Sequence, residues 1–184
     1  AGEIVTARAD GRMWGEAGES DRIIISSGDK ENPVYLDLNG KNLTVAGGIL
    51  VGPPVLFPGT DGSSLDDIEE FKTGALVIFD SGATRGSLTV EGRIVNEIGS
   101  SLVLTGVTCT PAYKDAFIHN RGDLEIQDGT VIEMTDDALG VPENGSRIID
   151  HRTESFNDLE AGHVEIGTKG RSPVRIIGQI DQAE

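Results

Sequence analysis

Two histidines in similar short segments are the residues whose types best suit a metal site. His119 stands in FIHN and His151 in IIDH, each after an apolar run, with Asp150 beside the second. If the two segments occupy equivalent places in a repeating structure, the imidazoles stack at one corner. Two imidazoles and a carboxylate are ligands that a metal such as Zn²⁺ accepts. Their spacing matches no established ligand motif, and stacked polar residues are also ordinary in solenoids, so a structural role is the alternative.

Four carboxylates near the start of one predicted helix could bind a cation. Residues 60–74, TDGSSLDDIEEFKTG, fit a short helix that Ser64 caps and that has apolar residues on one face. Acids at its amino-terminal end also compensate the helix dipole without any ion. We therefore expect the protein to have no cofactor. If the cluster does bind an ion, we expect that ion to be Ca²⁺. The four acids are Asp66, Asp67, Glu69 and Glu70.

Glycoside hydrolysis needs two carboxylates about 5 to 10 Å apart. Asp136 and Asp137 are the best adjacent pair, but a chain with 31 acidic residues offers such pairs anywhere. Three arginines are expected at corners, and no motif ties them to an acid cluster; they are Arg121, Arg147 and Arg152. The sequence contains no G-x-S-x-G, phosphate loop, zinc pattern or G-x-G-x-x-G. We therefore expect a protein that is not an enzyme.

Short β-strands must position these residues. Period-2 alternation directs two apolar side chains of each segment inward and directs Thr, Glu or Val away. The single cysteine, Cys109, falls on such a strand and is expected to be buried. The predicted inward pairs are Leu43/Val45, Leu88/Val90, Leu102/Leu104, Leu124/Ile126 and Val164/Ile166.

The strands recur in circuits of roughly 30 to 40 residues, of which we count about four. These circuits start near Val34, Leu76, Phe117 and Ile148. The pattern predicts an all-β fold, either a short parallel β-helix of about four coils or a β-sandwich. We favour the β-helix because medium aliphatic residues suit stacked rungs and because few matched hairpins occur. A solenoid also tolerates long excursions from one corner, which we expect at 52–74 and 135–146.

Three segments resemble the right-handed parallel β-helix of pectin-lyase-like proteins: LDLNGKNLTV, GSLTVEG and DLEIQDGTV. The resemblance covers about residues 34–180. It implies right-handed coiling, with Asn39-Gly40 at a corner between two rungs. Proteins of this fold include polysaccharide lyases and hydrolases, bacterial surface adhesins, and bacteriophage tailspikes or other virion proteins. The enzymes among them are usually much longer than this chain.

The amino-terminal residues 1–22 are predicted to form an arm or cap before a single β-helix domain at 23–184. A β-helix must hide its end strands, whose N–H and C=O groups are unpaired. The segment could cap the first rung or engage a partner as an arm. An Ala1-Gly2 start is what trimming of an initiator Met leaves, from which we expect a protein made without a secretion signal; a cleaved signal would leave the same start. The large apolar residues of the segment are Ile4, Val5, Met13 and Trp14.

Charge and hydropathy narrow the classes of partner. With 15 basic and 31 acidic residues the net charge is -16, which repels nucleic acid and anionic membrane surfaces. The longest apolar run is too short to span a membrane, so we expect neither nucleic-acid binding nor membrane insertion. We expect a homotrimer instead, because trimerisation would cover a lateral apolar surface. That surface would comprise Val51, Val55, Leu56 and Phe57.

These observations favour a non-enzymatic structural or binding protein. We expect a bacteriophage virion component, such as a capsid-decoration or tail-associated protein that contacts a major capsid or tail protein. One alternative is a secreted adhesin or carbohydrate-binding module, located outside the cell or on the bacterial surface. Another is a fragment of a polysaccharide depolymerase, in which Asp136 and Asp137 would act.

Overall fold

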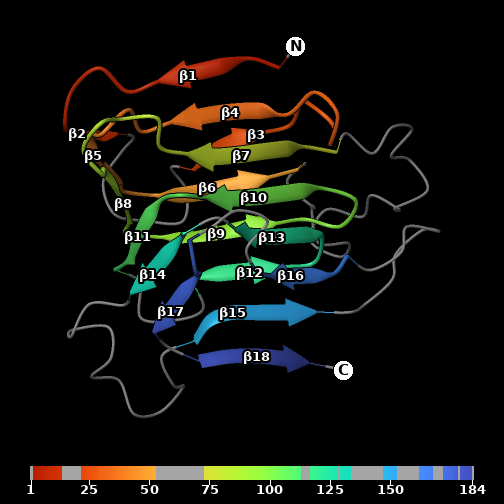
Figure 1. Cartoon of the computed structure of the whole chain (residues 1–184). Helices are drawn as coiled ribbons and strands as arrows, with labels where there is room; N and C mark the ends of the chain where they lie inside the picture. The colour runs from red at the N-terminus through yellow and green to blue at the C-terminus, as the bar shows by residue number, and fades with distance from the viewer. Residues whose placement is uncertain are drawn as a thin grey trace.

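A computed structural model describes the chain in segments. These are residues 2–13, 22–52, 73–112, 117–127, 129–133, 147–152, 162–167, 172–177 and 179–183. Within them the chain forms short β-strands and no helix (Figure 1). No helix long and apolar enough to cross a membrane occurs in these segments.

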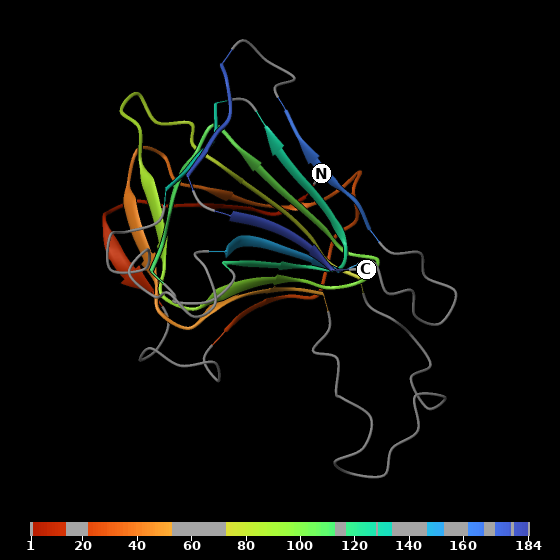
Figure 2. The ribbon, with the colours of Figure 1, turned by 90° about the horizontal axis from the view of Figure 1, so that it is seen from below.

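Every third described strand returns to the same sheet, so the described residues are wound into a solenoid of six coils and three parallel sheets. Sheet A contains β1 (Ile4–Thr6), β4 (Val34–Asp37), β7 (Ala75–Phe79), β10 (Ser101–Thr105), β13 (Asp123–Gln127) and β16 (Val164–Ile166). Sheet B contains β2 (Gly11–Met13), β5 (Asn42–Val45), β8 (Ser87–Val90), β11 (Thr108–Pro111), β14 (Val131–Glu133) and β17 (Arg175–Ile177). Sheet C contains β3 (Ile23–Ile25), β6 (Gly48–Val51), β9 (Arg93–Asn96), β12 (Ile118–Asn120), β15 (Arg147–Arg152) and β18 (Gln179–Ala183). Seen along the axis, the three sheets surround one interior (Figure 2).

The predicted all-β solenoid is confirmed, and the β-sandwich alternative is wrong because the sheets are built from parallel strands of successive coils. The described strands form six coils, whereas the sequence predicted about four. Two causes explain the difference. The coil that runs from Ser101 to Asp123 is shorter than the roughly 30 to 40 residues assumed. The first coil was also missed, because the three-residue strands β1 and β2 carry no inward pair of the predicted kind.

Part of the segment that was predicted to be an arm or cap belongs to the first coil. Strand β1 pairs in parallel with β4, and β2 pairs with β5. Met13 packs against the core. Deletion of residues 1–22 would therefore remove two strands of the solenoid. Trp14, the predicted helix and nearly all of both predicted excursions lie outside the described residues.

Inward side chains stack in columns, so like residues of successive coils lie above one another. One column of sheet A contains Val5, Leu36, Ile78, Leu104, Ile126 and Ile166. Four of the five predicted inward pairs are buried. The fifth lies in the last coil, where Val164 is half-buried and Ile166 is 41% exposed. Full burial of one such side chain stabilises the fold by about 1.5 to 3 kcal/mol, so the columns hold the coils together.

Cys109 is fully buried on β11, as its strand position predicts. Burial raises the pKa of its thiol to about 12, although the charge of Arg85 acts in the opposite direction. A thiol with so high a pKa is a poor nucleophile near neutral pH. Its role in the fold is therefore packing.

The corner predicted at Asn39-Gly40 is confirmed between β4 and β5. Both residues have left-handed backbone angles, with φ of 49° at Asn39 and 71° at Gly40. The Asp37 carboxylate accepts a hydrogen bond from the Asn39 N–H at 2.9 Å, and Asp80 of the next coil accepts one from the Gly40 N–H at 2.6 Å. Partial burial raises the pKa of Asp80, but three backbone N–H donors and Arg85 outweigh it, so the net shift is downward. Aspartates thus tie corresponding corners of neighbouring coils together.

Candidate interaction surfaces

The residues predicted to bind a partner have different positions in the structure. Ile4 and Val5 are 60% and 43% exposed on β1, while Met13 packs against the core. Val51 is fully buried, which corrects its assignment to a lateral surface. It faces inward on β6 because it stacks between Ile25 and Asn96. Trp14, Val55, Leu56 and Phe57 lie outside the described residues.

The predicted stacking of His119 on His151 is wrong. The strand register pairs His119 with Asp150, and it pairs Asn120 with His151. Because neighbouring residues of a strand point to opposite faces, this one-residue offset places the two imidazoles on opposite faces of sheet C. Among the described residues, no group of three or more His, Cys, Asp or Glu side chains could hold a metal. The other predicted metal ligands, Asp66, Asp67, Glu69 and Glu70, are not within those residues, nor are Asp136 and Asp137.

The inward face of sheet C contains a polar ladder that the sequence analysis missed. The Asn96 amide donates to Asn120 Oδ1 at 2.7 Å, and the Asn120 amide donates to the Gly122 carbonyl at 2.7 Å. Asn120 Nδ2 also lies 2.9 Å from His151 Nδ1. Both asparagines are fully buried, and His151 is 7% exposed. His151 is thus a structural member of the ladder. The sequence did contain a signal for this ladder, because RIVN and FIHN both place an asparagine at the end of the corresponding strand.

The outward face of sheet C carries a largely buried contact between His119 and Asp150, and the corner that follows β9 and β12 carries a largely buried ion pair between Arg121 and Glu97. His119 Nδ1 lies 3.1 Å from Asp150 Oδ2, and Arg121 Nη1 lies 3.7 Å from Glu97 Oε2. The structure therefore brings Arg121 to an acid that no sequence motif linked to it. Burial raises the pKa of Glu97, although Arg121, Arg22 and a backbone N–H partly oppose this. Glu97 Oε2 and Arg121 Nε are both inaccessible and have no hydrogen-bond partner among the residues that the structure describes, so this pair is poorly suited to receive a ligand.

Replacing Glu97 by glutamine should alter the dependence of stability on pH. A carboxyl group whose pKa is higher in the folded state binds more protons there than in the unfolded state. The free energy of unfolding then falls as pH rises from about the ordinary value of 4.5 through the raised value. We expect Glu97→Gln to remove this fall. Urea unfolding of both proteins between about pH 4 and 7 checks this; parallel pH profiles would contradict it.

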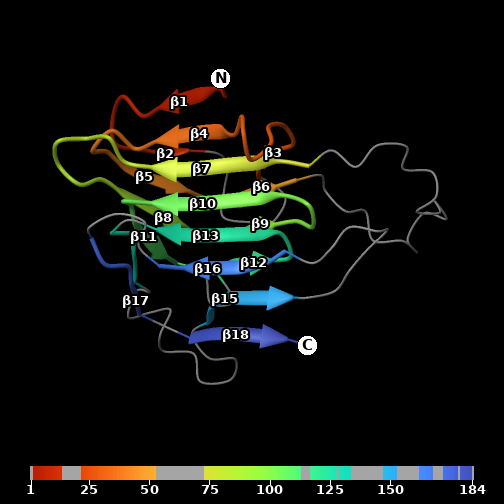
Figure 3. The same cartoon turned by 45° about the vertical axis from the view of Figure 1, so that its right-hand side comes forward.

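Strands β1, β4, β7 and β10 lie side by side in sheet A (Figure 3). The outward face of this sheet carries an apolar column over these first four coils. Its members, Ile4, Tyr35, Val77 and Val103, are exposed or half-exposed. The half-exposed ring of Phe79 extends this surface, with its centroid 6.1 Å from that of Tyr35 and the ring planes at 89°. We call these five residues the sheet A patch. Its signal in the sequence was the presence of apolar residues at both inward and outward positions of VYLD, ALVIF and SLVLT.

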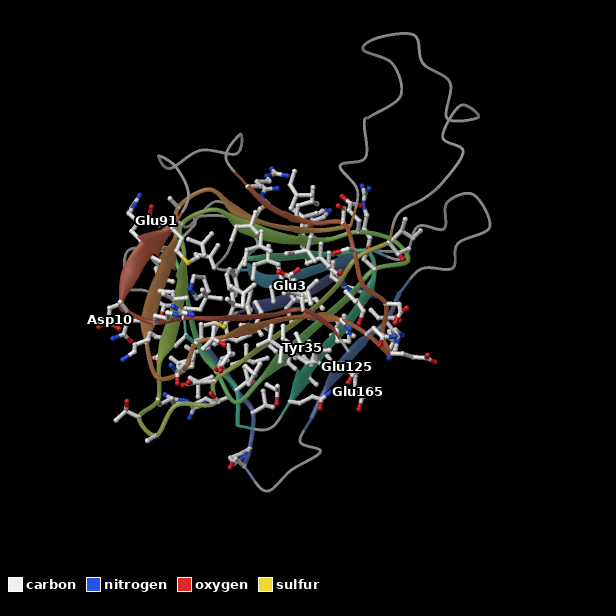
Figure 4. All side chains as sticks on the ribbon, turned by 90° about the horizontal axis from the view of Figure 1, so that it is seen from above. Glu3, Asp10, Tyr35, Glu91, Glu125 and Glu165 are labelled. Atoms are coloured by element: carbon white, nitrogen blue, oxygen red, sulfur yellow. The ribbon has the colours of Figure 1, made fainter. Side chains whose placement is uncertain are left out.

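The same column changes character in the last two coils. Val103 is followed by Glu125 and then by Glu165. Figure 4, viewed from the amino-terminal end, shows these two glutamates on the same side of the molecule as Tyr35. The sheet A patch is therefore limited to the amino-terminal four coils and is bordered by carboxylates.

Sheet B presents a different outward face. At the middle of its strands Thr44, Thr89 and Thr110 stack in successive coils. A neighbouring column contains Asn42, Ser87 and Thr108, in which the Ser87 hydroxyl donates to Asn42 Oδ1 at 2.8 Å. Short polar side chains suit a solvated sheet face, so the outward face of sheet B differs from that of sheet A.

Two cavities lie at the amino-terminal end. One of about 150 Å³ is lined by apolar and aromatic side chains of the first three coils, among them Val5, Ile23 and Ile25. The other, of about 280 Å³, shares Val5 and Leu36 with the first and reaches Met13. Among the described residues, the first coil therefore leaves part of the interior uncovered at this end.

Comparisons with known proteins complete these observations. The chain matches no protein-family model. No curated protein and no solved structure matches it either.

Proposed function

We propose that this protein is a non-enzymatic structural protein that assembles as a homotrimer through the outward face of sheet A. The sheet A patch carries the proposal, because it presents apolar side chains where sheet B presents threonines. Contiguous exposed apolar surface typically marks an interaction site.

Charge favours a second copy of the chain as the partner of this patch. With a net charge of -16, copies repel one another over most of their surface. None of the five residues of the patch is charged, so copies can approach there at the lowest electrostatic cost. Glu125 and Glu165 would stay at the rim, where water solvates them. Threefold closure would cover the patch of every copy at once.

A bacteriophage virion is the proposed setting, with the protein serving as a capsid-decoration or tail-associated component. The pattern resemblance to pectin-lyase-like β-helices, a fold that virion proteins use, supports this setting. The acidic surface supports it too, because it keeps assembled particles from adhering to one another. Contact with a major capsid or tail protein belongs to the same proposal.

Charge placed at the centre of the patch tests the trimer. We expect wild-type protein to have the mass of a trimer by light scattering. Val77→Glu should shift association to concentrations about a hundredfold higher or more, because it buries an unpaired carboxylate in the interface. Thr89→Glu is the matched control, since it adds the same charge at a mid-strand outward position of sheet B and should leave the trimer intact. A monomeric wild-type protein, or a fully trimeric Val77→Glu, would refute the proposal.

A further inference from the structure

Exposed large hydrophobic side chains are confined to the ends of the described solenoid. In the part of the chain that the structure describes, they are Ile4, Val5, Ile24 and Ile166. The first three belong to the first coil and the fourth to the last coil. Val5 and Ile166 are moreover the two terminal members of one inward column. No described strand pairs with the outer side of either residue.

The edges of the described sheets add to this exposure. Among the described strands, β1, β2 and β3 each form the edge of a sheet at one end, and β16, β17 and β18 form the edges at the other. Such edges readily pair with another strand. The two cavities beside Val5 show that the interior is also open to an added coil at the amino-terminal end.

We propose that the two ends of the solenoid bind each other, so that the first coil of one copy stacks on the last coil of another. This head-to-tail arrangement keeps adjacent strands parallel, as they are between all coils within the chain. It also places Val5 of one copy next to Ile166 of the other, which continues their column with like residues. The surface is distinct from the sheet A patch, which runs along the side of the molecule.

Charge complementarity supports the same arrangement. Asp10 lies beside Asn42, whose N–H donates to its carboxylate at 2.8 Å. From Asn42 the register leads through the successive coils of sheet B to Arg175 in the last coil. Asp10 and Arg175 are both exposed and stand at opposite ends of this one column. Head-to-tail stacking brings them together as an ion pair between copies.

Sedimentation velocity over a range of protein concentrations tests the stacking. The experiment uses the full chain carrying Val77→Glu, so that lateral trimers do not contribute, and it is repeated with wild type. We expect species that grow in multiples of the starting unit as concentration rises. Added salt should promote growth, because it screens the repulsion between acidic copies.

Reversing one end charge should weaken stacking, and reversing both should restore it. We expect Arg175→Glu to shift growth to concentrations about tenfold higher, and the double variant Asp10→Arg/Arg175→Glu to recover much of the loss. Lys41→Glu makes the same change of charge in the second coil and should have little effect. Circular dichroism confirms that each variant is folded, since Asp10→Arg also removes the bond to Asn42.

Two results would overturn the inference. One is the absence of growth at every concentration and salt level; the other is a double variant no better than Arg175→Glu alone. The two proposals can fail separately. If Val77→Glu protein stacks but wild type forms no trimer, the end-to-end inference stands and only the lateral trimer is rejected.

Discussion

Replacing Leu104 by alanine should lower the free energy of unfolding by about 2 to 5 kcal/mol. Leu104 is fully buried near the middle of the solenoid and stacks between Ile78 and Ile126. The coils above and below are held by parallel strand pairing, so the walls of the new cavity cannot collapse freely. Urea denaturation followed by circular dichroism measures the loss.

The matched control lies one residue away on the same strand. Thr105 points outward from β10 and is half-exposed. Thr105→Ala should change the free energy of unfolding by less than about 1 kcal/mol, because no buried contact is removed. Equal losses in the two variants would contradict the assignment of the inward and outward faces of β10.

Replacing Asn120 by alanine should cost about 2 to 5 kcal/mol, because several buried polar groups lose their partners at once. The Gly122 carbonyl loses a donor, the Asn96 amide loses an acceptor, and His151 Nδ1 loses its neighbour. Asn96 and Asn120 are fully buried, so polar groups that lose a partner there pay the cost of desolvation. We expect the loosening to be greatest where β12 meets β15, so hydrogen exchange of the Ile149 amide should accelerate.

Asn42→Ala is the control for the ladder. Asn42 is exposed on sheet B, and its side chain accepts one hydrogen bond from Ser87. Its loss should cost about 0.5 to 1 kcal/mol, since water can solvate the freed hydroxyl. If Asn120→Ala were no more harmful than Asn42→Ala, the interior ladder would not contribute to stability.

The sheet A patch and the two ends of the solenoid lead to different assemblies. The proposed lateral contact through the patch would close after three copies, whereas the proposed end-to-end contact would not close and would permit continued growth. Val77→Glu and Arg175→Glu act on one assembly each. Together they separate the two proposals within one set of sedimentation experiments.

Local alternation determined much of this fold from the sequence alone. A strand that buries one face must place apolar residues at every second position, so Leu102/Leu104 and Leu124/Ile126 indicated their inward direction without any neighbour. The Asn39-Gly40 corner was equally local, because Gly adopts a left-handed backbone at little cost and Asn tolerates one. The all-β class and the parallel solenoid followed from these signals.

Only the tertiary structure decided the register between coils, and with it the positions of the polar residues. Alternation determines which side chains of one strand point inward. It does not determine how that strand aligns with the strand of the next coil, because the connection between them varies in length. A shift of one residue in this alignment sends His119 and His151 to opposite faces, and the same pairing of β12 with its neighbours brings Arg121 to Glu97. Register also aligned Tyr35 with Val77 and Asp10 with the column of Arg175. These long-range alignments depend on packing between coils, which no short segment of sequence encodes.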